Sequence, residues 1–207
     1  MKILIKSLTL ALALFSTPFS FAQSKNLIVY FTQPENIDIN NIDAYSGASV
    51  ILKNGQTLGA TEYLARQIQS QLGGDLFSIE TEQVYPDTHQ PLLDFAQEEQ
   101  RKNIKPTLKA KPNLEDYDTV FVGYPIWWYQ MPMPLYTFFE QNNFSGKQIV
   151  LFVAHGGSRF SGTPDVIRKM QPNAKIEEGF EANLYKSTRA DEDLEKRLSD
   201  WLAKHKY

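Results

Sequence analysis

Three short apolar runs, one further strand candidate and one weaker one punctuate this sequence, and between them the hydrophobic residues repeat with helical spacing. Continuous apolar runs of this length predict strands buried on both faces, as in a parallel sheet. We expect strands at residues 25–31, 75–79, 119–122, 148–153 and 175–182. Their alternation with helices predicts an α/β domain, a three-layer sandwich in which a five-stranded parallel sheet lies between two layers of helices.

The segments between these runs carry the helical signals. Leu64, Ile68 and Leu72 recur every four residues, which predicts a first helix capped by Thr57 or Thr61. Further helices are expected at residues 91–103, 134–142, 164–170 and 194–202. Before the first helix, residues 32–56 form a polar stretch, and a loop of that length usually serves a function or is mobile.

Three unusual loops follow predicted strands, beginning after Phe31, Val122 and Val153. In parallel sheets, ligands bind outside the carboxyl ends of the strands, where the winding direction switches. Because all three loops lie at that edge, we expect the functional site there.

The second of these loops reads GYPIWWYQMP. Pro125 and Pro132 bound three consecutive aromatic residues, Trp127, Trp128 and Tyr129, which a core cannot easily absorb together. A flat aromatic ligand is one interpretation of this loop. The alternative is that one tryptophan packs under the loop as core.

The first loop ends in Asn54-Gly55-Gln56-Thr57, which we expect at a helix N-terminus. Free backbone amides and the helix dipole favour an anion there. Gly55 allows close approach of the backbone, and Thr57 and Thr32 supply hydroxyl donors, so a phosphate fits. The alternative is that Asn54-Gly55 is a plain turn and Thr57 a plain cap.

The third loop, AHGGSRFSG, carries three glycines that let backbone amides face a flat ligand edge. His155 and Arg159 are its candidates for hydrogen bonding or charge stabilisation. Ser158 lacks the second glycine of a nucleophile elbow, which disfavours a serine hydrolase. The three histidines show no metal-ligand spacing, and the P-loop and dinucleotide signatures are absent, so we expect no metal site and no such nucleotide site.

The start of the chain is typical of a secretory signal peptide. Lys2 and Lys6 precede an apolar run, and a small-x-small motif predicts cleavage after Ala22. The alternative, an uncleaved anchor, is disfavoured because the run is shorter than the roughly 20 residues that span a bilayer. We therefore expect a signal peptide at residues 1–22, one domain at residues 23–207, and a periplasmic or secreted protein without stable membrane insertion.

Composition excludes further classes. The chain has no cysteine, which rules out disulfides, cysteine nucleophiles and iron–sulfur ligation. Its net charge of -3 becomes more negative once the two leader lysines are removed, and mild acidity argues against nucleic acid as the partner.

The three loops together predict a phosphate site, an aromatic platform and a glycine-rich loop at one edge of the sheet. Flavin mononucleotide (FMN), a planar ring with a phosphate tail, fits all three.

These motifs resemble the flavodoxin family over nearly the whole mature chain. The resemblance rests on Tyr30-Phe31, Gly55-Gln56-Thr57, GYPIWW at residues 123–128, FSGK at 144–147 and HGGS at 155–158. It implies a flavodoxin-like sheet in the order 2-1-3-4-5 with FMN at the switch point. The family's compact phosphate loop is split by an insertion here, and the chain is less acidic than the family's electron shuttles.

Carried over to this sequence, the resemblance implies three groups of cofactor-binding residues. The phosphate would be bound by Thr32, Gly55, Gln56 and Thr57. One side of the isoalloxazine ring would face Pro125, Ile126, Trp127 and Trp128. Its other edge would face His155, Gly156 and Gly157.

The resemblance leaves three functions open. The first is an FMN-bound electron carrier with an unidentified redox partner, in which the flavin does the chemistry. The second is an FMN-dependent reductase of quinones or nitroaromatics, with no catalytic residue assigned. The third is a flavodoxin-shaped binding module that no longer holds FMN.

Overall fold

A computed structural model describes residues 25–36, 50–184, 192–205 and 207 of the 207-residue chain. The strands are β1 (Asn26–Tyr30), β2 (Val50–Lys53), β3 (Gln56–Gly59), β4 (Asp75–Ser78), β5 (Thr119–Pro125), β6 (Gln148–His155) and β7 (Lys175–Asn183). The helices are α1 (Ala60–Leu72), α2 (His89–Lys102), α3 (Met133–Gln141), α4 (Thr163–Met170) and α5 (Glu192–His205). The expected signal peptide at residues 1–22 lies outside the described residues.

The five expected strands form one parallel sheet, in the order β4-β1-β5-β6-β7. The central strands β1, β5 and β6 are buried almost throughout. That burial explains why each is a continuous apolar run rather than an alternating one. The prediction of an α/β domain with a five-stranded parallel sheet is confirmed.

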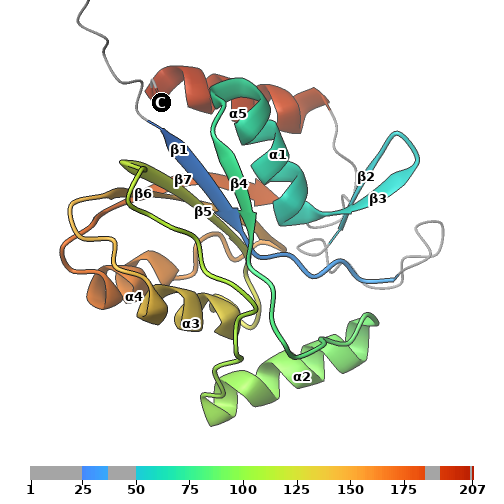
Figure 1. Cartoon of the computed structure of the whole chain (residues 1–207). Helices are drawn as coiled ribbons and strands as arrows, with labels where there is room; N and C mark the ends of the chain where they lie inside the picture. The colour runs from blue at the N-terminus through green and yellow to red at the C-terminus, as the bar shows by residue number, and fades with distance from the viewer. Residues whose placement is uncertain (1–24, 37–49, 185–191, 206) are drawn as a thin grey trace, which may run out of the picture.

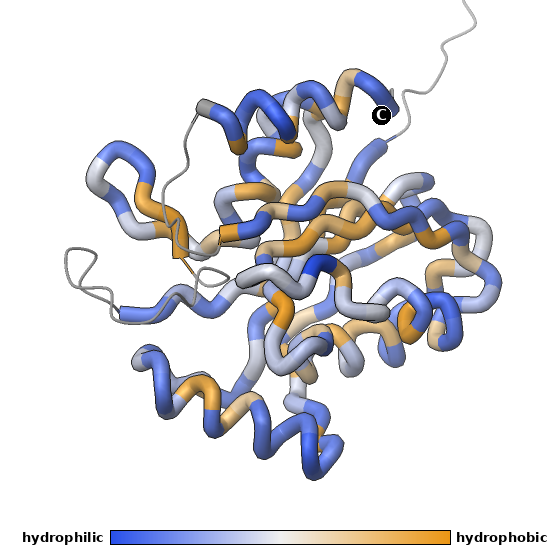
Figure 2. The backbone as a smooth tube through the Cα atoms, turned by 180° about the vertical axis from the view of Figure 1, so that it is seen from behind, coloured by the Kyte–Doolittle hydropathy of each residue, from blue (hydrophilic) through white to orange (hydrophobic). Residues whose placement is uncertain are grey.

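Helices cover both faces of this sheet (Figure 1). On one face, α1 and α5 pack over Ile28, Phe121 and Phe152. On the other face, α2, α3 and α4 enclose a second core that contains Val122 and Leu151. The hydrophobic residues accordingly concentrate along the central strands, and the outer sides of the helices are largely hydrophilic (Figure 2). No helix among the described residues is both long and apolar enough to cross a membrane.

One expectation about the segment before α1 is wrong. We expected a loop up to residue 56 and then a helix capped by Thr57 or Thr61, but β2 and β3 form an antiparallel hairpin, and α1 begins at Ala60 with Gly59 as its N-cap. Asn54 and Gly55 make the turn with φ of 52° and 77°. Asn-Gly is the preferred pair for a two-residue hairpin turn of this handedness, so the plain-turn alternative for these two residues holds.

The hairpin is attached to the helices beside it. Lys53 of β2 forms an ion pair with Glu195 of α5. The hydroxyl of Tyr63 on α1 donates to the same carboxylate at 2.5 Å. Val50 and Ile51 are buried, which places the base of the hairpin against the core on the α1 side.

Candidate functional site

The three unusual loops meet at the carboxyl edge of the sheet. The ring of Phe31, which follows β1, lies 5.6 Å from the ring of Trp127, which follows β5. Ile126 N–H donates to the carbonyl of Ala154 on β6 at 2.9 Å. Segments more than a hundred residues apart in the sequence thus build one site.

The first part of the site is the N-terminus of α1. A β-carbon placed on Gly59 would lie 2.1 Å from Oγ1 of Thr32, a distance that no real contact reaches. Gly59 is therefore required here because Thr32 approaches its backbone, and φ at Gly59 is an ordinary -63°. The contact brings the end of β1 and the start of α1 together.

Thr61, in the first turn of α1, has an unusual environment. It is fully buried, and its Oγ1 has no hydrogen-bond partner within the described part of the chain. A buried hydroxyl without a partner costs about 1–3 kcal/mol, so such groups are rare and call for an explanation. A helix N-terminus already offers free backbone amides and a positive dipole end, and the Thr61 hydroxyl adds one more donor. This donor set fits a phosphate.

The four residues predicted to bind phosphate lie at two different places in the structure. Thr32 lies at the α1 N-terminus, but Gly55, Gln56 and Thr57 lie on the exposed outer part of the β2–β3 hairpin. A second Gly-x-Thr pattern, Gly59-Ala60-Thr61, stands four residues later, at the start of α1. Glu62 indicates that start in the sequence, since an acidic residue directly before a helical repeat marks a first turn.

The aromatic loop follows β5, whose last residue is Pro125. Trp127 is buried, at 7% exposure, whereas Trp128 is 41% and Tyr129 72% exposed. The expectation that one tryptophan packs as core is met by Trp127, which contacts the rings of Phe31 and Tyr85. Trp128 and Tyr129 face outward and are available to a ligand.

The loop turns sharply at its tip. Trp127 and Gln130 exchange both backbone hydrogen bonds at 2.9 Å, which closes a two-residue turn. The two residues between them, Trp128 and Tyr129, have φ of 47° and 61°. Left-handed backbone is uncommon for residues other than glycine, asparagine and aspartate, and it concentrates at functional sites.

Helix α2 supports this loop from outside. The side-chain amide of Gln100 donates to the carbonyl of Trp127 at 2.9 Å, and the indole N–H of Trp128 donates to the carbonyl of Leu93 at 2.9 Å. Next to Gln100, Glu99 accepts the hydroxyl of Tyr85 at 2.7 Å. Burial raises the pKa of both groups in that pair, so it favours the neutral carboxyl and the neutral phenol.

The third loop begins at His155, which the structure turns inward. Its ring is 1% exposed, Nδ1 accepts the N–H of Gly157 at 2.9 Å, and Nε2 lies 2.5 Å from the carboxylate of Glu181. Because Nδ1 accepts a backbone N–H, the ring proton is on Nε2 and is donated to Glu181. Both ring nitrogens are thus occupied, and His155 shapes the loop while Gly156 and Gly157 remain exposed.

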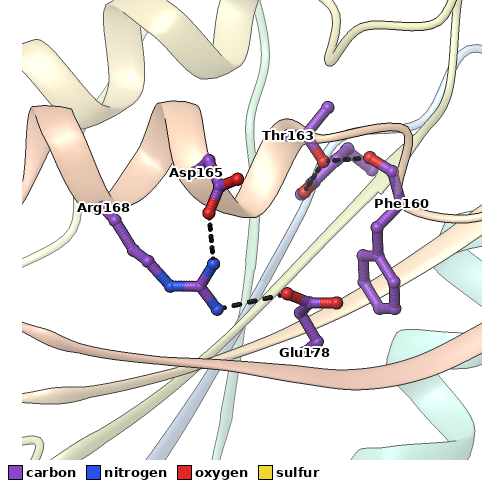
Figure 3. Close-up of polar contacts among 6 residues, drawn as sticks. Phe160, Thr163, Asp165, Arg168 and Glu178 are labelled. Atoms are coloured by element: carbon purple, nitrogen blue, oxygen red, sulfur yellow. Dashed lines mark hydrogen bonds and ion pairs between the residues drawn. The ribbon is translucent and has the colours of Figure 1, made fainter.

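The rest of this loop joins α4 and β7 around a pocket of about 510 Å³. The side chain of Thr163 donates to the carbonyl of Phe160 at 2.7 Å, which fixes the start of α4 (Figure 3). Arg168 bridges Asp165 on its own helix and Glu178 on β7. Two lining residues of the pocket, Asp165 and Glu178, are therefore linked through Arg168. Over the described ranges, no group of three potential metal ligands occurs.

The comparisons with known proteins agree with this geometry. Residues 50–203 match the family described as flavodoxin. This chain belongs to the flavodoxin family. Among curated proteins, none matches it.

Solved structures similar to this flavodoxin-family chain include a candidate flavoprotein from Bacteroides eggerthii. That protein is 28% identical, with a TM-score of 0.60 over 87% of this chain and 97% of its own. A second, from Bacteroides uniformis, has 19% identity and a TM-score of 0.62 over 87% and 98% of the two chains. A flavoprotein from Lactobacillus acidophilus, solved in complex with FMN, is 16% identical with a TM-score of 0.54 over 84% and 98%. The last two likenesses show the fold alone.

Proposed function

We propose that this protein binds FMN at the carboxyl edge of its sheet and transfers electrons. The arrangement of the sheet supports this, because the five parallel strands, numbered among themselves, run 2-1-3-4-5. In that order the winding direction switches between β1 and β5, where flavodoxin-like folds bind FMN. The aromatic loop follows β5, and the contact of Thr32 with Gly59 places the α1 N-terminus at the end of β1, the other strand of this switch.

The observation that carries the proposal is the Thr61 hydroxyl, which has no hydrogen-bond partner among the described residues. It is buried in the first turn of α1, next to the Gly59–Thr32 contact. We assign the FMN phosphate to this turn, where Thr61, Thr32 and the free backbone amides are the donors. The assignment replaces Gly55, Gln56 and Thr57, which the hairpin carries away from the helix N-terminus.

The remaining residues suit the isoalloxazine ring. We assign one side of the ring to Pro125, Ile126, Trp127 and Trp128, of which Trp128 has the exposed indole. The exposed backbone of Gly156 and Gly157 would meet the other edge, held in place by the inward-turned His155. When bound, FMN supplies reversible electron transfer, and the protein sets the surroundings of the ring.

A reductase of quinones or nitroaromatics is the second candidate. The pocket of about 510 Å³ at residues 158–162 favours it, because a small aromatic substrate fits a space of this size beside the third loop. The sequence also bears on where the protein works, whichever of the two functions it has. If the predicted signal peptide directs export, the protein works in the periplasm or outside the cell with a redox partner that is not yet identified.

Absorption spectroscopy tests the proposal directly. The mature protein, residues 23–207, is incubated with FMN and separated by gel filtration. We expect the flavin bands to elute with the protein and to shift relative to free FMN. Colourless protein would exclude both flavin functions and leave a binding module. Turnover of a quinone by the coloured protein with a chemical electron donor would favour the reductase over the carrier.

A further inference from the structure

We propose that Gln100 of α2 is a positioning residue, which holds the aromatic loop in the conformation that receives the flavin ring. The inference rests on the proposed function, since it concerns the platform of the same site.

The turn at Trp128-Tyr129 has the same form as the hairpin turn at Asn54-Gly55. Each is a two-residue turn closed by backbone hydrogen bonds, and each has both central residues at positive φ. Asparagine and glycine adopt this backbone readily, whereas tryptophan and tyrosine do so at a cost. The local sequence therefore stabilises the hairpin turn but opposes the aromatic one, which needs support from elsewhere in the fold.

Gln100 provides that support. A carbonyl only accepts hydrogen bonds, so the amide nitrogen of Gln100 must be the atom that faces Trp127 at 2.9 Å. The same carbonyl accepts the N–H of Gln130, which closes the turn. Both acceptor positions of the Trp127 carbonyl are then filled, and the orientation of the peptide between Trp127 and Trp128 is fixed.

Burial alone does not fix the indole of Trp128, because this side chain is 41% exposed. Its ring is held by the hydrogen bond to the Leu93 carbonyl, which lies on α2 as Gln100 does. Helix α2 thus forms two hydrogen bonds with the turn, one to the Trp127 backbone carbonyl and one from the Trp128 indole. The loss of the Gln100 bond frees the peptide and lets the Trp128 ring leave its position.

Two substitutions test this role. Gln100→Leu keeps the bulk of the side chain and removes the donor, and Gln100→Glu keeps the shape but only accepts hydrogen bonds at neutral pH. Gln97→Leu is the matched control, because Gln97 is an exposed residue of the same helix. The protein is labelled with 5-fluorotryptophan, whose three signals are assigned with Trp127→Phe and Trp128→Phe. The signal of Trp201 on α5 then serves as the internal reference.

In the protein without flavin, we expect both Gln100 variants to shift or broaden the signals of Trp127 and Trp128 but not that of Trp201. FMN dissociation constants should rise about three- to tenfold, as the loss of one hydrogen bond predicts. The thermal unfolding midpoint should change no more than in Gln97→Leu, which separates positioning from a general structural role.

Unchanged fluorine signals in both Gln100 variants would overturn the inference, and so would FMN binding within twofold of the wild type. If the wild type itself binds no FMN, the proposed function fails. The fluorine spectra of the flavin-free protein then still decide whether Gln100 holds the turn.

Discussion

Replacing Thr61 by valine should make the flavin-free protein more stable and the flavin complex weaker. Valine has the shape of threonine but lacks the hydroxyl, and the Thr61 hydroxyl is buried with no partner among the described residues. A buried polar group without a hydrogen bond costs about 1–3 kcal/mol, and Thr61→Val removes that cost. For a domain of this size, each 1 kcal/mol raises the unfolding midpoint by about 2–4 °C.

The effect on binding has the opposite sign. A hydrogen bond to a charged group contributes about 1.5–3 kcal/mol, so the loss of the Thr61 donor should weaken FMN binding roughly ten- to hundredfold. Thermal unfolding followed by circular dichroism measures the first effect, and titration of FMN fluorescence measures the second. Together they test whether the fold keeps a destabilising hydroxyl for its ligand.

Thr57→Val is the control, because Thr57 lies on the exposed hairpin strand β3. It should change stability by no more than about 0.5 kcal/mol and leave FMN binding unaltered. The reasoning is refuted if Thr61→Val destabilises the flavin-free protein, or if Thr57→Val rather than Thr61→Val weakens the complex. The second result would assign the FMN phosphate to the hairpin residues instead of the α1 N-terminus.

Two further substitutions test the surroundings of the site. Gly59→Ala places a β-carbon 2.1 Å from Oγ1 of Thr32 and should cost about 1–3 kcal/mol in urea unfolding. Adding Thr32→Ala should recover most of that loss, and a fully stable Gly59→Ala would contradict the contact. Burial raises the pKa of Glu99, so its contribution to stability is complete below the unfolded pKa of about 4.3 and is lost as the pH rises through the folded pKa. Glu99→Gln should therefore gain stability relative to the wild type between pH 4 and pH 8, and a constant difference across that range would show that Glu99 does not titrate there.

The sequence predicts the central strands of the sheet well because they are buried on both faces. Val120 and Val150 lie in continuous apolar runs, and such runs need no tertiary information to recognise. The hairpin differs from the expected loop for a local reason. Val50 and Ile51 directly follow a long polar stretch, which hides a strand of only four residues, although Asn54-Gly55 is a strong hairpin signal. The apolar repeat of α1 fixes the face of the helix but not its first residue.

The site is less predictable than the sheet, because it depends on contacts between distant segments. Core packing of one tryptophan is one of two interpretations that the sequence allows, and the structure shows that this tryptophan is Trp127. No local pattern indicates that His155 turns toward Glu181, or that Gln100 reaches Trp127, because these partners come from different elements. That the Thr61 hydroxyl has no partner in the described part of the chain likewise becomes visible only when its surroundings are known.

In the proposed phosphate site, the insertion between β1 and α1 divides the loop without separating the residues on either side of it. The free energy of bringing the ends of a flexible loop together grows only with the logarithm of its length, so added residues cost little if the ends still meet. Here the ends do meet, since the side chain of Thr32 lies against the backbone of Gly59. The hairpin leaves and re-enters next to this contact, because its last residue, Gly59, is also the N-cap of α1. In the proposed site, this contact takes the place of a continuous loop sequence, and the phosphate-binding motif lies at the start of the helix rather than at the end of the strand.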